Sequence, residues 1–270
     1  MVVQHNLTAM NANRNLSTVT GAQQKSTEKL SSGYRINRAA DDAAGLSISE
    51  KLRSQIRGLD KAASNSQDGI SLVQVAEGAL NETHSILQRM NELATQAAND
   101  TNTSTDRASI QKEMDQLTSE IDRIRSTTQF NSMNLLDGTF TGMKLQVGAL
   151  SGQSIVISID NMNASSLKIS GLKVSSFSSA GKAMTAIQKA INSVSVQRSK
   201  LGAIQNRLEH TINNLNTTSE NTSAAESRIR DVDMATEMVE YSKNNILAQA
   251  GQSMLAQANQ ATQGVLSLLQ

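Results

Sequence analysis

Apolar residues recur at alternating steps of three and four through much of this 270-residue chain. Such spacing places an apolar seam along one side of an α-helix and is typical of helices that pack as coiled coils. We expect long helices joined through these seams. The most regular series consists of Val73, Ala76, Leu80, Thr83, Leu87, Met90, Ala94 and Ala97.

Two further series extend the helical pattern. Residues 100–106 are Asp, Thr, Asn and Ser, which favour turns and helix caps, so the two series on either side predict an antiparallel helix hairpin. The longest series predicts a helix of about 45 Å at ~1.5 Å per residue, with polar interruptions at Arg198 and Gln205 that set its register. The second series is Ile110, Met114, Leu117, Ile121 and Ile124, and the third is Met184, Ile187, Ile191, Val194, Arg198, Leu201, Gln205, Leu208, Ile212 and Leu215.

The chain has no Pro, no Trp, three Phe and two Tyr. Without the commonest helix breaker and with few large side chains, it favours a slender helical bundle over a globular core. Glycines punctuate residues 130–181, where the runs 144–147 and 155–159 are typical of short strands. The predicted fold is mainly α: an elongated helical rod with terminal coiled-coil helices and a small β-hairpin region in the middle of the chain.

The two ends are almost free of charge. Residues 244–270 contain no charged side chain, and residues 1–24 contain only Arg14. Short helices without charge pairs are marginal alone, so we expect the ends to associate with each other or with neighbouring chains, as polymerisation seams. The predicted seam residues are Val3, Leu7 and Met10 at the head and Leu247, Gly251, Met254, Ala258, Ala261, Val265 and Leu268 in the tail.

Several classes of function are disfavoured. The formal net charge of +1 gives no positive field for nucleic acid, and no run approaches the ~20 apolar residues of a membrane span. His5, His84 and His210 stand singly, so no metal or cofactor site is predicted. The pair Asp41–Asp42 lies beside arginines and is explained better by salt bridges and turn capping than by catalysis. We expect no enzyme activity and no cleaved signal peptide.

Five segments resemble bacterial flagellin. They are KLSSGYRINRAADDAAGL at 29–46, NSQDGISL at 65–72, LGAIQNRL at 201–208, ESRIRDVDMA at 226–235 and MLAQAN at 254–259. The resemblance covers about residues 1–138 and 181–270, in the family's order. The middle segment is short, so the chain resembles a member with little or no outer variable domain.

This resemblance implies a structural subunit that polymerises into the flagellar filament for swimming motility. It implies a terminal coiled-coil core domain of residues 1–40 with 231–270, and a helical rod domain of residues 41–230 that includes the β region. It also implies an extracellular location reached through type III export. The implied partners are further copies of the chain, an export chaperone at the C-terminal segment, and the hook–filament junction and cap proteins.

One further implication concerns Toll-like receptor 5, which recognises the surface of some flagellins. The matching residues are Gln88, Arg89, Leu93 and Glu113. An Arg beside a Leu is a typical pair of binding hot spots. Solvated charges on a helix are the alternative interpretation of Arg89 and Glu113.

Two other functions remain open from the sequence. A signalling coiled coil of the chemoreceptor type shares the composition, although the predicted strands argue against it. A junction protein that joins or caps filaments would share the terminal helices but would stop at a single ring instead of polymerising. An enzyme inserted in the middle segment is disfavoured because that segment is small and has no catalytic constellation.

Overall fold

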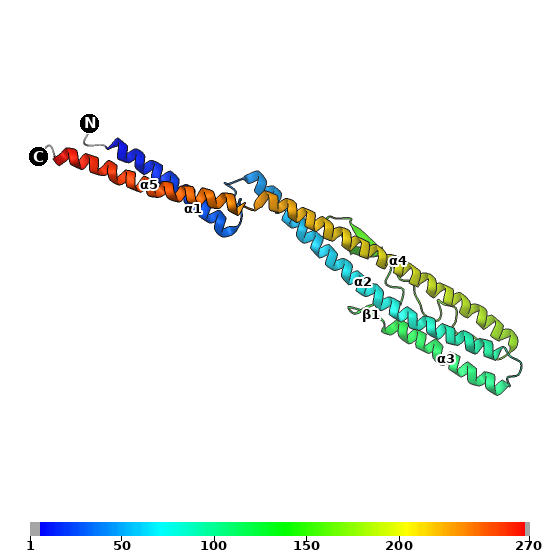
Figure 1. The fold of residues 1–270 in the computed structure, drawn as a ribbon. Coiled ribbons are helices and arrows are strands. Elements are labelled where there is room, and N and C mark those ends of the chain that lie inside the picture. The colour runs from blue at the N-terminus through cyan, green and yellow to red at the C-terminus, as the bar shows by residue number, and fades with distance from the viewer. Residues whose placement is uncertain (1–5, 268–270) are drawn as a thin grey trace. The chain divides into compact units, whose positions relative to one another are not determined.

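The computed structural model describes the backbone of residues 6–267 and the side chains of residues 6–261 (Figure 1). Two small strand pairs follow the third helix and precede the fourth. The mainly helical fold with a small β region in the middle of the chain is confirmed. The helices are α1 (Leu7–Ser32), α2 (Ala43–Ala97), α3 (Ser104–Thr127), α4 (Phe177–Arg230) and α5 (Met234–Ser267). The strands are β1 (Gln129–Phe130), β2 (Met133–Asn134), β3 (Met143–Gln146) and β4 (Ser154–Ile157).

The chain divides into two compact units. The terminal unit comprises the chain up to Ser54 and from Asn221 onward, and the middle unit comprises Gln55–Glu220. Both divisions fall within long helices, in α2 and in α4. The terminal unit is therefore built around α1 and α5, and the middle unit around α3 with most of α2 and α4.

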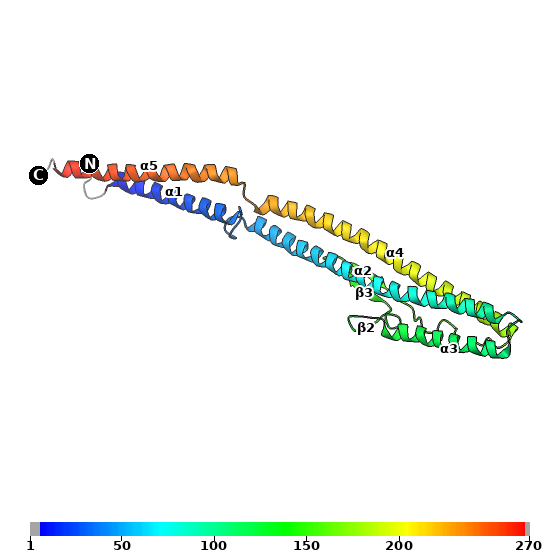
Figure 2. The ribbon, with the colours of Figure 1, turned by 60° about the horizontal axis from the view of Figure 1, so that its bottom comes forward.

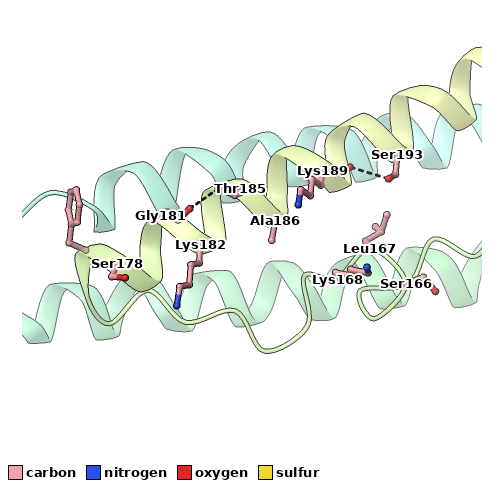
Figure 3. Close-up of a pocket in the computed structure, with 11 residues that line it drawn as sticks. Ser166, Leu167, Lys168, Ser178, Gly181, Lys182, Thr185, Ala186, Lys189 and Ser193 are labelled. Atoms are coloured by element: carbon pink, nitrogen blue, oxygen red, sulfur yellow. Dashed lines mark hydrogen bonds between the residues drawn. The ribbon is translucent and has the colours of Figure 1, made fainter.

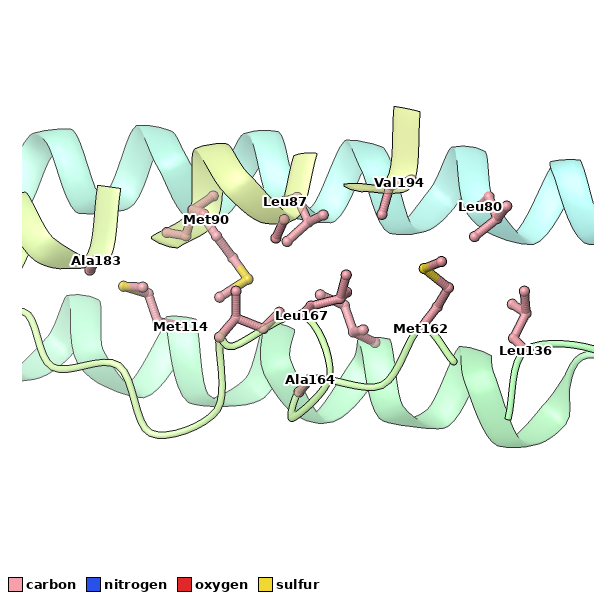
Figure 4. Packing of buried hydrophobic residues seen from close by; sticks show 14 of the residues in the cluster. Leu80, Leu87, Met90, Met114, Leu136, Met162, Ala164, Leu167, Ala183 and Val194 are labelled. Atoms are coloured by element: carbon pink, nitrogen blue, oxygen red, sulfur yellow. The ribbon is translucent and has the colours of Figure 1, made fainter. Parts of the chain in front are cut away.

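The core of the middle unit follows the predicted seams. All eight residues of the 73–97 series are at most 1% exposed, and Ile110, Met114 and Ile121 of α3 are buried as well. Figure 4 shows Leu87 and Met90 of α2 directed towards Met114 of α3 and side chains of α4. The predicted antiparallel hairpin of α2 and α3 is confirmed, and the turn between them ends in a capping box formed by Thr103 and Asp106.

The seam of α4 differs from the predicted series at alternate positions. Ile187, Val194 and Leu201 are buried as predicted, but the intervening buried residues are Ala190 and Gln197 instead of Ile191 and Arg198. The predicted interruption at Arg198 is only partly buried, and the buried polar residue is its neighbour. Gln197 donates from Nε2 to the carbonyl oxygen of Ser158 at 3.2 Å where α4 meets the middle segment, and its buried Oε1 atom has no hydrogen-bond partner among the described residues.

The middle segment contains the two predicted strands and one hairpin that the sequence did not predict. β3 and β4 pair antiparallel from Met143↔Ile157 to Gln146↔Ser154. β1 and β2 are joined by Asn131 and Ser132, both with positive φ, at 48° and 62°. Two consecutive residues with positive φ form the tight turn that matches strand twist. A glycine usually marks such a turn, and its absence here hid the hairpin from the sequence.

A long stretch without regular structure connects β4 to α4 and lies on the helices. Gln111 of α3 accepts from the backbone N–H of Val174 at 2.9 Å and donates to the carbonyl oxygen of Leu172 at 2.8 Å. Asp122 of the same helix accepts from the backbone N–H of Ala164 at 3.0 Å. Buried Met162 and Leu167 point into the core from this stretch (Figure 4). It is therefore part of the packed unit and covers the side of the bundle that α3 leaves open.

Candidate assembly surface

Helices α1 and α5 lie side by side and antiparallel, as Figure 2 shows. Near the chain ends, Asn6 donates from Nδ2 to the carbonyl oxygen of Ala258 at 3.0 Å. At the opposite end of the pair, Lys29 Nζ lies 3.3 Å from a carboxylate oxygen of Glu237. The two polar contacts fix the register of the pair over most of the length of α1.

Small and medium-sized side chains alternate with a few large ones in the contact between these helices. Inward positions follow the three-and-four spacing on both helices, and a side chain at Gly251 would press on Leu16, so glycine permits close packing there. The buried or half-buried residues at this spacing are Ala9, Ala12, Leu16, Val19, Gln23, Ser26 and Leu30 of α1, and Glu237, Tyr241, Asn244, Ala248, Gly251, Leu255 and Ala258 of α5.

Backbone pairing closes the terminal unit at the opposite end from the chain termini. α1 ends at Gly33, whose φ of 75° is left-handed, and Val232 donates its N–H to the Gly33 carbonyl oxygen at 3.0 Å. Arg230 lies with its guanidinium 4.8 Å from the centroid of the Tyr34 ring. The same guanidinium lies 2.8 Å from a carboxylate oxygen of Glu50 and holds the pKa of Glu50 below its ordinary value.

The acidic pair of the sequence analysis lies in this region. Asp41 accepts from the backbone N–H groups of Asn37 at 3.2 Å and Arg38 at 3.0 Å, and the Arg38 bond is the main cause of its lowered pKa. Asp42 accepts from the N–H of Gly45 at 2.8 Å and so caps the start of α2. Turn capping accounts for both carboxylates as predicted. Arg38 forms its ion pair with Glu28 of α1 at 2.9 Å.

Large apolar side chains remain exposed on the outside of the α1–α5 pair. We call this set the terminal apolar surface. Full burial of one such side chain contributes about 1.5–3 kcal/mol, so a contact that covers several of them would be strongly favourable. The set consists of Leu7 (67% exposed), Met10 (62%), Met234 (49%), Met238 (49%), Val239 (70%), Ile246 (67%), Leu247 (44%) and Met254 (61%).

The predicted seam residues divide between the inside and the outside of the pair. Leu7, Met10, Leu247, Met254 and Ala261 are exposed. Gly251 and Ala258 are half-buried against α1. The members of the predicted tail series therefore alternate between the contact with α1 and the outer face of the pair. Val3 and Leu268 lie outside the described residues, and the side chain of Val265 does too.

Met234, Met238, Val239 and Ile246 of the terminal apolar surface were not predicted from the sequence. Val239 and Ile246 are seven residues apart, so they lie on one face of α5, two turns from each other. The charged residues Glu237, Glu240 and Lys243 lie among them and obscured the apolar pattern. The spacing of seven between Val239 and Ile246 was the sequence pattern that could have predicted this exposed face.

The four residues matched to receptor recognition lie in the middle unit. Arg89 donates from Nη2 to Glu113 at 3.0 Å and from Nη1 to Glu92 at 3.2 Å, and these carboxylates raise the pKa of its guanidinium. Gln88 lies 3.1 Å from the Nε2 atom of His84. Leu93 is only 2% exposed and belongs to the core. The exposed side chains Arg89 and Glu113 are thus joined across α2 and α3, with Leu93 beneath them.

Two features are absent from the described part of the chain. Within residues 6–267, no helix combines the length and apolar character needed to cross a bilayer. Over the same residues, no group of three His, Asp or Glu side chains is placed to hold a metal ion.

Comparisons with known proteins agree on one family. The bacterial flagellin N-terminal helical region matches residues 3–141, and the bacterial flagellin C-terminal helical region matches residues 184–269. A flagellin of Halalkalibacterium halodurans is 57% identical over 271 residues, and one of Bacillus subtilis is 52% identical over 304 residues, with both chains covered completely in each case. The crystal structure of Bacillus cereus flagellin is 34% identical, with a TM-score of 0.52 over 60% of this chain and 94% of that one.

Proposed function

The chain belongs to the bacterial flagellin family and is a structural subunit of the flagellar filament, and we propose that it polymerises through the terminal apolar surface. The observation that carries the proposal is the exposure of eight large apolar side chains on α1 and α5. Exposed apolar groups of this number are typical of surfaces that bind another protein. Identical copies are the natural partner in a polymer.

The proposal assigns different tasks to the two sides of each terminal helix. Inward residues such as Leu16 and Ala248 hold α1 to α5 within one chain. Outward residues such as Met10 and Ile246 contact neighbouring chains. Because each subunit repeats both sets, one chain can pair internally and still present a surface to the next.

The test compares two exposed, helical, β-branched residues. Ile246→Gln should raise the critical concentration for filament growth at least tenfold, while the monomer unfolds at an unchanged temperature, because surface substitutions usually alter stability by less than about 0.5 kcal/mol. Val196→Gln is the matched control in the middle unit, where Val196 is 56% exposed, against 67% for Ile246. Sedimentation of polymer against monomer measures the effect. Equal assembly by both variants would contradict the proposal.

We further propose the division of the filament subunit into a core domain of residues 1–40 with 231–270 and a rod domain of residues 41–230. The separate packing of the terminal and middle units supports a division into two parts, and the units themselves meet at residues 54/55 and 220/221. We also propose type III export, and a chaperone that covers the C-terminal segment before assembly. The exposed apolar residues of α5 support the chaperone, since they need cover in the cytoplasm. The hook–filament junction and cap proteins are the proposed partners at the filament ends.

A second proposal is recognition of the monomer by Toll-like receptor 5. Its support is the exposed cluster of Gln88, Arg89 and Glu113 on the middle unit. Arg89 offers a planar group with several donors, which is common among hot-spot residues. Leu93 contributes indirectly: its buried side chain packs in the core and positions the part of α2 that carries Gln88 and Arg89.

A further inference from the structure

One stretch of the chain carries cations and no acidic residue. Between Asp160 and Glu209, residues 161–208 contain seven Lys and Arg residues and no Asp or Glu, although the whole chain has 25 basic and 24 acidic residues. Arg198 and Lys200 of this stretch pair with Glu77 and Asp160, at 3.6 Å and 3.4 Å. The remaining lysines, Lys168, Lys173, Lys182 and Lys189, form no ion pair with any carboxylate in the described part of the chain.

Three of these lysines line one cavity. It lies between the first turns of α4 and the loop that precedes this helix, and it has a volume of about 810 Å³. Figure 3 shows Lys182 and Lys189 on α4 and Lys168 on the loop. The lining adds the hydroxyls of serines and a threonine and the exposed ring of Phe177, but no carboxylate. The cavity is open to solvent and has three cations on its walls. The hydroxyls of Thr185 and Ser193 donate to the carbonyl oxygens of Gly181 and Lys189, at 3.1 Å and 3.0 Å, and Ser166 and Ser178 supply the other two hydroxyls.

The backbone at Lys168 places a cation where glycine would be easier to accommodate. Its φ of 57° is left-handed, a conformation that residues other than glycine rarely adopt. The turn is fixed by hydrogen bonds from the N–H of Leu167 to the Asn163 carbonyl oxygen at 3.0 Å and from the N–H of Ile169 to the Ala164 carbonyl oxygen at 2.9 Å. Residues in rare conformations gather at functional sites. The left-handed turn places Lys168 in the wall of the cavity, opposite α4.

The spacing of the lysines indicates the shape of the ligand. Lys182 and Lys189 are seven residues apart on one helix, which corresponds to about 10.5 Å along its axis. Cations that far apart suit a chain with repeated negative charges better than one compact anion. Lysine presents a point charge without the planar fork by which arginine binds phosphate. Phe177 is the only aromatic residue that lines the cavity, whereas proteins that bind single-stranded nucleic acid stack successive bases on several aromatic rings.

We propose that this cavity, which we call the lysine groove, binds an acidic polysaccharide through Lys168, Lys182 and Lys189. The ligand class is a sugar polymer with sulfate or carboxylate groups at regular intervals. The proposal rests on the proposed function in one respect, because a filament outside the cell meets such polymers. The binding itself is a property of the middle unit and does not require assembly.

The experiment measures the binding of the full-length monomer to dextran sulfate by interferometry over a series of salt concentrations. Lys182→Gln with Lys189→Gln should weaken binding about tenfold or more and reduce its salt dependence, because each surface lysine near a polyanion contributes a similar factor. The matched control is Lys61→Gln with Lys112→Gln, two exposed lysines of the same unit that line none of its described cavities. This control should bind as the wild type does.

Lys168→Gly separates binding from folding. Glycine suits the left-handed backbone at this position, so the variant should unfold at the same temperature or higher and still bind dextran sulfate several-fold more weakly. Undiminished affinity would overturn the role of Lys168. Equal loss of affinity in the two double variants would overturn the lysine groove, since binding would then follow overall charge.

Two further arms test the class of ligand. Uncharged dextran should not bind, and oligo-dT should bind more weakly than dextran sulfate at equal charge; the reverse order would overturn the choice of a polysaccharide. The same preparations are then induced to polymerise. Monomer that binds dextran sulfate but forms no filament would refute the proposed assembly surface alone, whereas filaments formed from monomer that does not bind would refute the lysine groove alone.

Discussion

At the residue scale, two side chains one turn apart in α2 have different expected roles, because one is exposed and the other is buried. Arg89 is exposed and pairs with Glu113 of α3, whereas Leu93 is buried. Arg89→Ala should reduce receptor activation by the monomer at least several-fold while leaving the free energy of unfolding within about 1 kcal/mol, since exposed ion pairs contribute little. A reporter assay in receptor-expressing cells measures the first effect, and denaturant unfolding measures the second.

Arg123→Ala is the control for Arg89. Arg123 is also exposed and pairs with Glu120 of α3, so its loss should leave activation unchanged. Leu93→Ala should instead cost about 2–5 kcal/mol of stability, because it opens a cavity in the core. If Arg123→Ala lowered activation as much as Arg89→Ala, the assay would be reporting helix charge in general, and the assigned cluster would be wrong.

The ion pair between Arg230 and Glu50 should make the stability of the fold depend on pH. Arg230 lowers the pKa of Glu50, mainly through their hydrogen bond. A carboxyl group with a lower pKa in the folded state stabilises the fold above its unfolded pKa, and this contribution is lost as the pH falls through the folded pKa. Acid should therefore lower the melting temperature of the wild type more than that of Glu50→Gln, when both are followed by circular dichroism between pH 6 and pH 3.

Glu82→Gln serves as the control for that comparison, because Glu82 is exposed and forms no ion pair with a described side chain. Its acid dependence should match the wild type. If Glu50→Gln lost stability in acid as steeply as the wild type does, the Arg230 contact would not contribute to the fold in solution.

At the element scale, the tail of α5 is the part whose removal should separate folding from assembly. Deleting residues 258–270 removes the end of α5, while the core of the middle unit lies entirely between residues 55 and 220. The shortened chain should keep the helical signal and cooperative unfolding of the middle unit but form no filaments when salted out. Filament growth by the shortened chain would contradict the role of the tail.

The elements also show what sequence alone can establish. The seam of α2 was predictable residue by residue, because Leu80, Leu87 and Met90 are large and face one core. The seam of α1 was not, because it is made of small residues such as Ala9 and Ala12, and the more apolar Leu7 and Met10 drew the predicted series to the outer face. In α4, alanines at 183 and 190 took positions that had been assigned to Met184 and Ile191.

One of the two candidate sites could be predicted in part from the sequence, and the other could not. The charge-free ends and the residues Leu7, Met10, Leu247 and Met254 pointed to the terminal apolar surface, and all four are exposed. The lysine groove was not predictable, because it needs a loop and a helix start to meet, and only the folded chain brings Lys168 beside Lys182. Leu93 was assigned to the receptor-binding surface, but it is buried because it shares one helix face with Met90 and Ala94.

At the scale of the whole molecule, the two units differ in how they bury their apolar residues. The middle unit buries its apolar residues within itself, with seams from α2, α3 and α4. The terminal unit buries Ile36 and the inward residues of α1 and α5, but it leaves the eight large apolar side chains of the terminal apolar surface exposed. We expect the middle unit to be complete as a monomer and the terminal unit to reach its full stability only in the filament.

The most direct measurement is electron microscopy of the purified full-length chain after salting-out, with Ile246→Gln prepared in parallel. We expect long, uniform filaments from the wild type and monomers from the variant at the same concentration. Short closed rings from the wild type would contradict indefinite polymerisation and favour a junction protein, and equal filaments from both chains would contradict assembly through the terminal apolar surface.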